Sequence, residues 1–147
     1  MALLNLFNFL HFVGLIWGVG GATIATIISV KADKNPDVAK ASMKIMPAIV
    51  KLIWLGMILL IISGIALPFY ISWPLNKQML LVKHVLVAWI VIFGVAVGMS
   101  SKKMSRFAPK GKEAPDKRFI KAKKRTKAFS IVNLILWYVV TLLSVWV

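Results

Sequence analysis

The sequence predicts an all-α integral membrane protein that forms an up-down-up-down four-helix bundle, with both chain ends on the outer side. Three observations lead to this. The chain is 60% hydrophobic with a mean hydropathy of +0.85, which is too apolar for an ordinary soluble domain. It contains four apolar runs long enough to cross a hydrocarbon core of about 30 Å. Its basic residues are concentrated in two of the three connections. At 147 residues we expect a single transmembrane domain, residues 1–147.

The four expected spans cover, in order, about residues 3–30, 45–73, 79–100 and 128–147. The first run has no basic segment before it and is too long for a signal peptide, so we expect a span. Short connections make sequential helices antiparallel neighbours, which gives the up-down-up-down order. Pro36 and the segment 109–115 should be non-helical, whereas residues 119–126 can extend the fourth helix as a basic stalk.

The net charge of +15 is explained by topology. Residues 31–44 carry four lysines and two aspartates, and the basic loop 101–127 carries twelve basic and two acidic residues, whereas the turn 73–78 has only Lys77. By the positive-inside rule, loops 31–44 and 101–127 are expected to be cytoplasmic in the inner membrane of a bacterial or archaeal-type cell. The same charges would contact anionic membrane lipids. We expect no nucleic-acid binding, because the basic loop lacks aromatic stacking platforms.

The only two histidines, His11 and His84, lie inside expected spans, where an ionisable residue is costly and indicates function. Counted from the outer edges, they lie roughly 12 Å and 8 Å deep. The first and third helices of such a bundle are diagonal, so the two imidazoles should face each other across the core. Imidazole suits iron, and bundle cores hold cofactors, which favours a bis-histidine haem b. Catalytic zinc would need a third ligand, and no span contains a carboxylate. The chain has no cysteine, which excludes disulfides and covalent c-type haem.

Small residues follow His11 along one helical face, at spacings of three and four: Gly14, Gly18, Gly21 and Ala25. Two interpretations stay open. Small residues let membrane helices approach closely, or they leave room for a flat macrocycle beside the ligand. Trp17, in mid-span, either fills volume or flanks an inserted ring. Lys83, next to His84, either pairs with a haem propionate or extends to the headgroups.

The remaining polar residues of the spans are expected to bond to other helices or to their own helix: Asn5, Asn8, Thr23, Thr26, Ser63, Asn133 and Thr141. Three aromatic residues fall at the expected outer interface and are typical membrane anchors: Tyr70, Trp73 and Trp146.

The stretch "LHFVGLIWGVGG" resembles the opening helix of small four-span bacterial membrane proteins that include the HemJ-type protoporphyrinogen oxidases and the CopD-type copper-resistance proteins. The matching residues are His11, Trp17, Gly20 and Gly21, and "LLVKHVLVAW", with Lys83, is similar to the start of their third span. The resemblance covers the chain to about Gly98. The HemJ-type proteins are associated with haem b, so the resemblance implies that cofactor.

Together these features predict a membrane b-type haem protein with His11 and His84 as axial ligands in the outer half of the bilayer. Because bis-histidine ligation leaves no open position, electron transfer follows as its function. The cofactor site would also include Lys83, Gly14, Gly18 and Trp17. A redox partner, either a quinone or another membrane subunit in a homo- or hetero-oligomer, would complete the path. Two alternatives stay open: a HemJ-like protoporphyrinogen oxidase, and a non-catalytic structural subunit of a larger membrane complex. The sequence therefore predicts neither the presence nor the absence of enzymatic activity.

Overall fold

The computed structural model describes residues 1–71, 76–107 and 116–144, and every regular element in these ranges is a helix. The elements are α1 (Ala2–Leu15), a π-helical turn η1 (Ile16–Gly20), α2 (Gly21–Ala32), α3 (Pro36–Tyr70), α4 (Lys77–Arg106) and α5 (Lys117–Leu143). The first three form one continuous helix, so the described chain has four helices long and apolar enough to cross a membrane. The expected all-α, four-helix membrane bundle is confirmed.

The polar ends of the helices differ from the sequence interpretation at one point. The expectation that Pro36 is non-helical is wrong, because Pro36 is the first residue of α3. Proline suits this position, since its missing N–H would have no helical partner there. Asn35 caps the helix, and its side-chain oxygen accepts from the backbone N–H groups of Asp37 (2.9 Å) and Val38 (3.3 Å). The segment 109–115 lies outside the described residues.

The predicted basic extension of the fourth helix is confirmed, because α5 begins at Lys117 and includes residues 119–126. Asp116 caps this helix through a bond from the backbone N–H of Arg118, at 3.2 Å. Asn76 caps α4 in the same way, accepting from the N–H groups of Gln78 and Met79, both at 3.2 Å. A side-chain oxygen at each of these starts satisfies N–H groups that the helix itself leaves unpaired.

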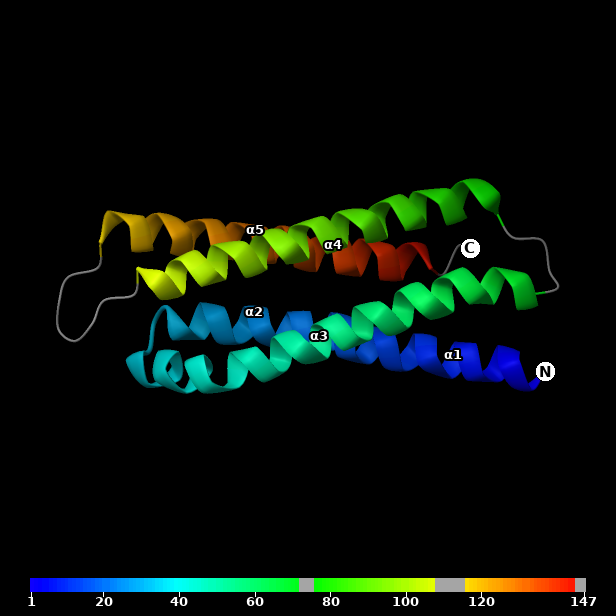
Figure 1. The fold of residues 1–147 in the computed structure, drawn as a ribbon, viewed down its shortest axis with the longest axis horizontal. Helices are drawn as coiled ribbons and strands as arrows, with labels where there is room; N and C mark the ends of the chain where they lie inside the picture. Colours follow the sequence, from blue (N-terminus) through cyan, green and yellow to red (C-terminus); the bar gives the residue numbers. More distant parts are fainter. Residues whose placement is uncertain (72–75, 108–115, 145–147) are drawn as a thin grey trace.

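The helices run in alternating directions, as Figure 1 shows. The start of α1, the end of α3, the start of α4 and the end of α5 lie at one end of the bundle. The end of α2, the start of α3, the end of α4 and the start of α5 lie at the opposite end. The first helix (α1, η1 and α2) packs on α3, α4 packs on α5, and η1 and α2 also contact α5. The buried apolar core lies where these pairs meet and consists of Ala22, Met57, Ile90, Trp137 and Val140.

Glycines bring the first helix and α3 into close contact. A Cβ added to Gly56 would stand 2.5 Å from the backbone N of Gly18 and 2.8 Å from the carbonyl O of Gly14. A Cβ on Gly14 would lie 2.8 Å from Leu60, and one on Gly21 would lie 2.7 Å from Ile53. Side chains of α3 occupy the space over Gly14 and Gly21, and the first helix occupies the space over Gly56, so close helix packing is the role that the geometry shows for them.

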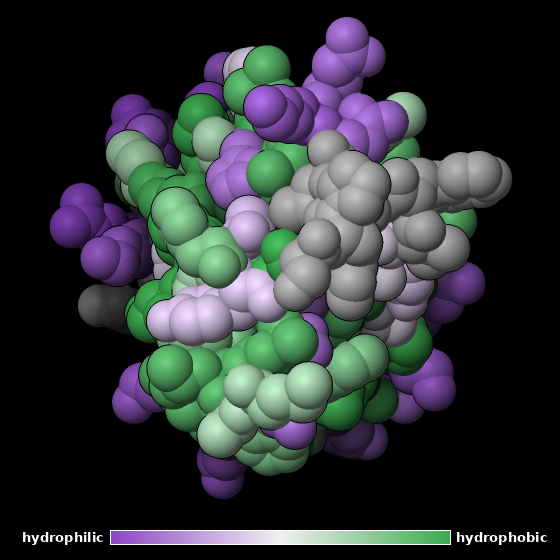
Figure 2. Space-filling model, turned by 90° about the vertical axis from the view of Figure 1, so that its right-hand side faces the viewer, coloured by the Kyte–Doolittle hydropathy of each residue, from purple (hydrophilic) through white to green (hydrophobic). Residues whose placement is uncertain are grey.

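The outer surface of the bundle is apolar, which suits contact with lipid. Figure 2 views the molecule from the end that carries both termini, and much of the face outside the grey residues is hydrophobic. Every one of the four helices exposes large apolar side chains, for example Phe12, Ile65, Leu81 and Leu142, which are 66%, 54%, 66% and 66% exposed. Of the expected aromatic anchors, Tyr70 is exposed and stacks on Phe7, and Trp73 and Trp146 lie outside the described residues.

Candidate functional site

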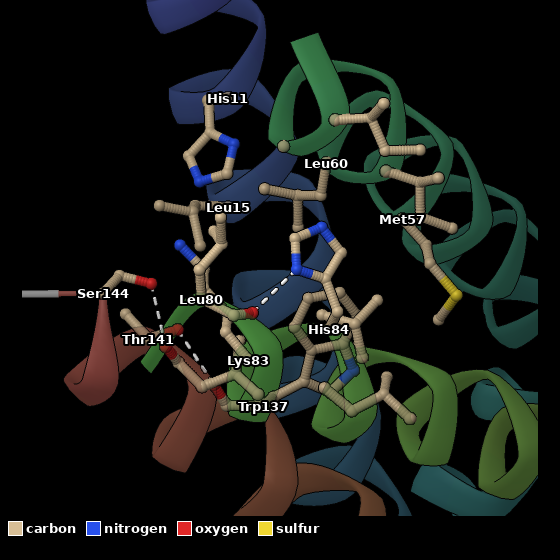
Figure 3. A pocket seen from close by; sticks show the side chains of 16 residues that line it. His11, Leu15, Met57, Leu60, Leu80, Lys83, His84, Trp137, Thr141 and Ser144 are labelled. Atoms are coloured by element: carbon tan, nitrogen blue, oxygen red, sulfur yellow. Dashed lines mark hydrogen bonds between the residues drawn. The ribbon is translucent and has the colours of Figure 1, made fainter. Parts of the chain in front are cut away.

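A cavity of about 100 Å³ lies in the half of the bundle nearer the termini and is lined by side chains from all four spans. Figure 3 shows this cavity and its lining. Its polar residues are His11 from α1, Lys83 and His84 from α4, and Thr141 and Ser144 from α5. The rest of the wall is mainly apolar. The structure therefore brings together the three polar residues that the sequence singled out, from two helices that are not direct neighbours.

The position and tautomer of His11 are determined by Ser63. The Nδ1 atom of His11 lies 2.9 Å from the Ser63 hydroxyl oxygen on α3. Ser63 is fully buried, and its hydroxyl donates to the carbonyl of Leu59 at 2.6 Å. Because a hydroxyl has one hydrogen, the serine oxygen can only accept from His11. His11 therefore donates from Nδ1–H, and in the neutral ring Nε2 has a free electron pair.

His84 is held in the same tautomer by its own helix. Its Nδ1 atom lies 2.7 Å from the carbonyl oxygen of Leu80, and a carbonyl can only accept. His84 therefore donates from Nδ1–H, and in the neutral ring Nε2 again has a free electron pair. Neither Nε2 atom has a hydrogen-bond partner among the residues that the structure describes. In Figure 3 the two rings extend into the region between α1 and α4.

The cavity opens sideways, between α3 and α4. Most of its lining is buried or half-buried, whereas the exposed members are Ile61 and Ile65 of α3 and His84 of α4. A ligand could reach the histidines from the lipid phase past these exposed side chains.

The other expected site residues lie at helix contacts. Gly14 packs against Leu60 and Gly56, and a Cβ on Gly18 would stand 2.7 Å from the Trp137 ring. A Cβ added to Gly56 would lie 2.9 Å from the Cβ of Trp17, so Trp17 is part of the interface between the first helix and α3. These three residues support the wall of the cavity from behind, and the cavity itself is lined by other side chains.

Trp137 is the cavity residue that sequence reasoning missed. It is 3% exposed, and its indole Nε1 is buried with no hydrogen-bond partner among the described residues. The available signal was its place inside the fourth apolar run, since tryptophans of membrane helices are enriched at the interfaces.

Polar interactions at the opposite end join the first and last helices. Asp33, directly after α2, accepts from Lys127 and pairs with Lys123 on α5, each at 2.7 Å. These bonds from Lys123 and Lys127 hold the pKa of the Asp33 carboxyl below its usual value. Within the described part of the chain, no group of three histidines, cysteines or carboxylates is placed to hold a metal ion.

The family comparison agrees with the apolar four-helix architecture. A model for a family described as predicted integral membrane proteins (DUF2269) matches residues 5–146. The chain belongs to this family. The match includes all four helices and the lining of the cavity, so the DUF2269 assignment covers both the fold and the site. No curated protein and no solved structure matches the chain.

Proposed function

We propose that this DUF2269 protein is a membrane haem b protein that transfers electrons, with His11 and His84 as the two axial ligands. One observation carries the proposal: the only two histidines of the chain line one cavity, and both are held with the proton on Nδ1 and a free electron pair on Nε2. Histidines that bind a metal usually donate their other N–H to a carbonyl or a similar acceptor, which fixes tautomer and orientation.

The donor atoms of the cavity fit a haem, and the volume of the cavity requires it to widen when a haem binds. Two neutral imidazoles suit iron, and the apolar walls suit a macrocycle. The enclosed volume of about 100 Å³ is below the roughly 300–1,000 Å³ of ordinary ligand pockets. We therefore expect binding to widen the opening between α3 and α4, where the lining is already exposed. A haem with two histidine ligands supplies a one-electron couple.

The chain's own residues would position the two histidine rings, exclude water from the cavity and orient the protein in the membrane. Ser63 holds the His11 ring through its Nδ1–H, and the carbonyl of Leu80 holds His84. The buried apolar side chains Met57, Ile90 and Val140 exclude water from the inner wall. The basic residues near Asp33 at the far end support an orientation in which the cavity lies in the outer half of an inner membrane. A quinone or another membrane subunit would then exchange electrons there.

An absorption spectrum of the protein purified in detergent, after expression with a haem supply, tests the proposal. We expect a Soret band and a sharp α-band on reduction, and we expect His11→Ala and His84→Ala each to abolish the low-spin spectrum. Thr26→Val is a matched control, because Thr26 bonds only to its own helix, at 2.9 Å to Ala22 O. It should leave the spectrum unchanged.

Other spectra would overturn the proposal. No haem bands in the purified protein would leave the histidines as helix-packing residues of a structural subunit. A low-spin spectrum that survives one histidine substitution would contradict bis-histidine ligation. A high-spin spectrum in the unmodified protein, together with turnover of protoporphyrinogen, would replace electron transfer with the HemJ-like oxidase activity.

A further inference from the structure

We infer that the cavity has a lateral gate, at which the bundle parts between α3 and α4. Trp54 on α3, whose ring lies over Gly94 on α4, holds this gate closed. The ligand that the gate admits is an apolar molecule dissolved in the lipid and larger than the closed cavity. The inference rests on the proposed function only in identifying that molecule as haem b.

The four spans form two pairs, and the contact between the pairs is one-sided. The first helix packs on α3, and α4 packs on α5, as the lower and upper pairs of Figure 1. Between the pairs, η1 and α2 pack on α5, whereas in the described part of the chain the backbones of α3 and α4 do not pack closely. The pairs are therefore joined along the first helix and α5, from the middle of the bundle to the end opposite the cavity.

The polar interactions between the pairs lie on that same side. The Tyr138 hydroxyl on α5 lies 3.0 Å from the Thr23 hydroxyl oxygen on α2. Asp33, directly after α2, forms ion pairs with Lys123 and Lys127 of α5. Among the residues that the structure describes, no side-chain hydrogen bond or ion pair joins α3 to α4. The contact of the first helix with α5 can thus act as a hinge, and α3 and α4 can part with the least loss of interaction.

Trp54 makes an apolar contact across the side that lacks polar bonds. It is half-buried on α3, and a Cβ added to Gly94 would lie 3.7 Å from its ring and 3.9 Å from the methyl carbon of Met57. These are ordinary van der Waals distances, so side chains of α3 rest on a bare stretch of α4. Met57 also lines the cavity, so this contact borders it. Within lipid an apolar contact between helices has no hydrophobic driving force, and lipid chains can replace it when the helices part.

The cavity lies on the side that can part. Its exposed lining residues are Ile61 and Ile65 of α3 and His84 of α4. Its volume of about 100 Å³ is too small for a macrocycle, since pockets for such ligands hold roughly 300–1,000 Å³. A ligand of that size therefore enters only when α3 and α4 separate, and it comes from the lipid that surrounds the exposed side chains.

Opening of the gate can be measured without haem. The chain has no cysteine, so Ile90→Cys places a single thiol in the cavity wall, at a residue that is 1% exposed. Its rate of reaction with N-ethylmaleimide, in phosphatidylcholine vesicles, reports how often the cavity opens. We expect Trp54→Ala to raise this rate at least about fivefold, because the closed state loses an aromatic contact. Trp89→Ala is the matched control, since Trp89 is 48% exposed on α4 and does not line the cavity; it should change the rate less than about twofold.

A second thiol separates gating from general loosening of the bundle. Ser100 is 6% exposed on α4 and does not line the cavity, so the thiol of Ser100→Cys reacts only if the bundle loosens elsewhere. Trp54→Ala should leave that rate unchanged. A rise at both thiols, or no rise at Ile90→Cys, overturns the gate. If circular dichroism shows that Ile90→Cys fails to fold, Val140→Cys replaces it, because Val140 is 6% exposed in the same cavity wall.

A reversible cross-link tests whether the ligand enters through this gate. Trp54→Cys with Gly94→Cys joins α3 to α4 outside the cavity. Linking this pair with a disulfide-containing bis-maleimide should slow haem uptake at least about tenfold relative to the same variant after the linker is cleaved and the reductant removed. Thr23→Cys with Tyr138→Cys is the matched control, because it joins α2 to α5 on the hinge side. It should take up haem equally fast when linked and when cleaved.

The possible failures are distinguishable. Equal haem uptake by the linked and the cleaved α3–α4 variant overturns the gate. A low-spin haem spectrum together with an unchanged thiol rate in Trp54→Ala supports the proposed function and overturns the gate. If no haem binds, but Trp54→Ala raises the rate at Ile90→Cys and not at Ser100→Cys, the gate stands and the haem proposal fails.

Discussion

Substituting Gly56 by alanine tests the link between helix packing and the site. The new Cβ would stand 2.5 Å from the backbone N of Gly18, whereas ordinary contact begins at 3.4 Å. The first helix and α3 must therefore separate locally by about 0.9 Å, the difference between these distances. The neighbouring atoms are backbone, so no flexible side chain can move aside. Overpacking of this kind costs about 1–3 kcal/mol of unfolding free energy.

The same displacement should reach His11. The bond from its Nδ1 to Ser63 joins the same two helices at 2.9 Å, and lengthening it by about 0.9 Å would take it beyond hydrogen-bond distance. We therefore expect Gly56→Ala to lose stability and to weaken haem binding together, although Gly56 does not line the cavity.

Unfolding by sodium dodecyl sulfate, followed by tryptophan fluorescence, measures the change in free energy. Gly20→Ala and Gly98→Ala are matched controls, because a Cβ at either position meets nothing within 4 Å. Both should remain within about 0.5 kcal/mol of the unmodified protein. If Gly56→Ala is as stable as these controls, the close approach of the first helix to α3 is refuted.

Two further predictions concern single hydrogen-bonding groups. Ser63→Ala removes the acceptor of the His11 Nδ1–H and should weaken haem binding about 10–100-fold in a spectroscopic titration. Ser42→Ala is the control and should leave haem affinity unchanged, because the Ser42 hydroxyl bonds only to Ala39 of its own helix. Equal haem affinities of the two variants would contradict the role assigned to Ser63. Asp33→Asn should cost about 0.2–1 kcal/mol at pH 7. Because Lys123 and Lys127 lower the pKa of Asp33 in the folded state, its contribution is fully present above the unfolded pKa of about 4 and is lost as the pH falls through the folded pKa. Unfolding measured from pH 7 to pH 2.5 should therefore show the gap between the two proteins closing below about pH 4, and a gap that stays constant would refute this.

The fold was predictable from the sequence because lipid restricts it strongly. A chain that crosses hydrocarbon must satisfy its backbone hydrogen bonds internally, so long apolar runs become helices. The helix ends were less predictable, because hydropathy reports the thickness of the apolar layer and not the length of the helix. Pro36 shows this: it lies in a polar stretch, yet Asn35 and Pro36 form a good helix start, and α3 begins there.

The candidate site was predictable to the extent that depth and topology determine it. Depths that agree within about one helical turn on the first and third spans predicted that His11 and His84 face each other, and both line one cavity. The sequence could not show which group each Nδ1 bonds, because that depends on the rotamer of each ring and on the face that α3 presents to α1. The roles of Gly14 and Gly18 depended on the same packing, which places Leu60 and Trp137 over them.

The glycines of the first helix and the histidine on its face act together. A small surface at Gly14 and Gly18 lets α3 approach until Gly56 meets backbone. Only at that separation can Ser63, two turns further along α3, accept a hydrogen bond from the Nδ1–H of His11. That bond in turn leaves the Nε2 electron pair free, which is the property a metal ligand requires. Close helix contact at the glycines therefore positions the imidazole of His11. The packing role of the glycines supports the ligand role proposed for the histidine.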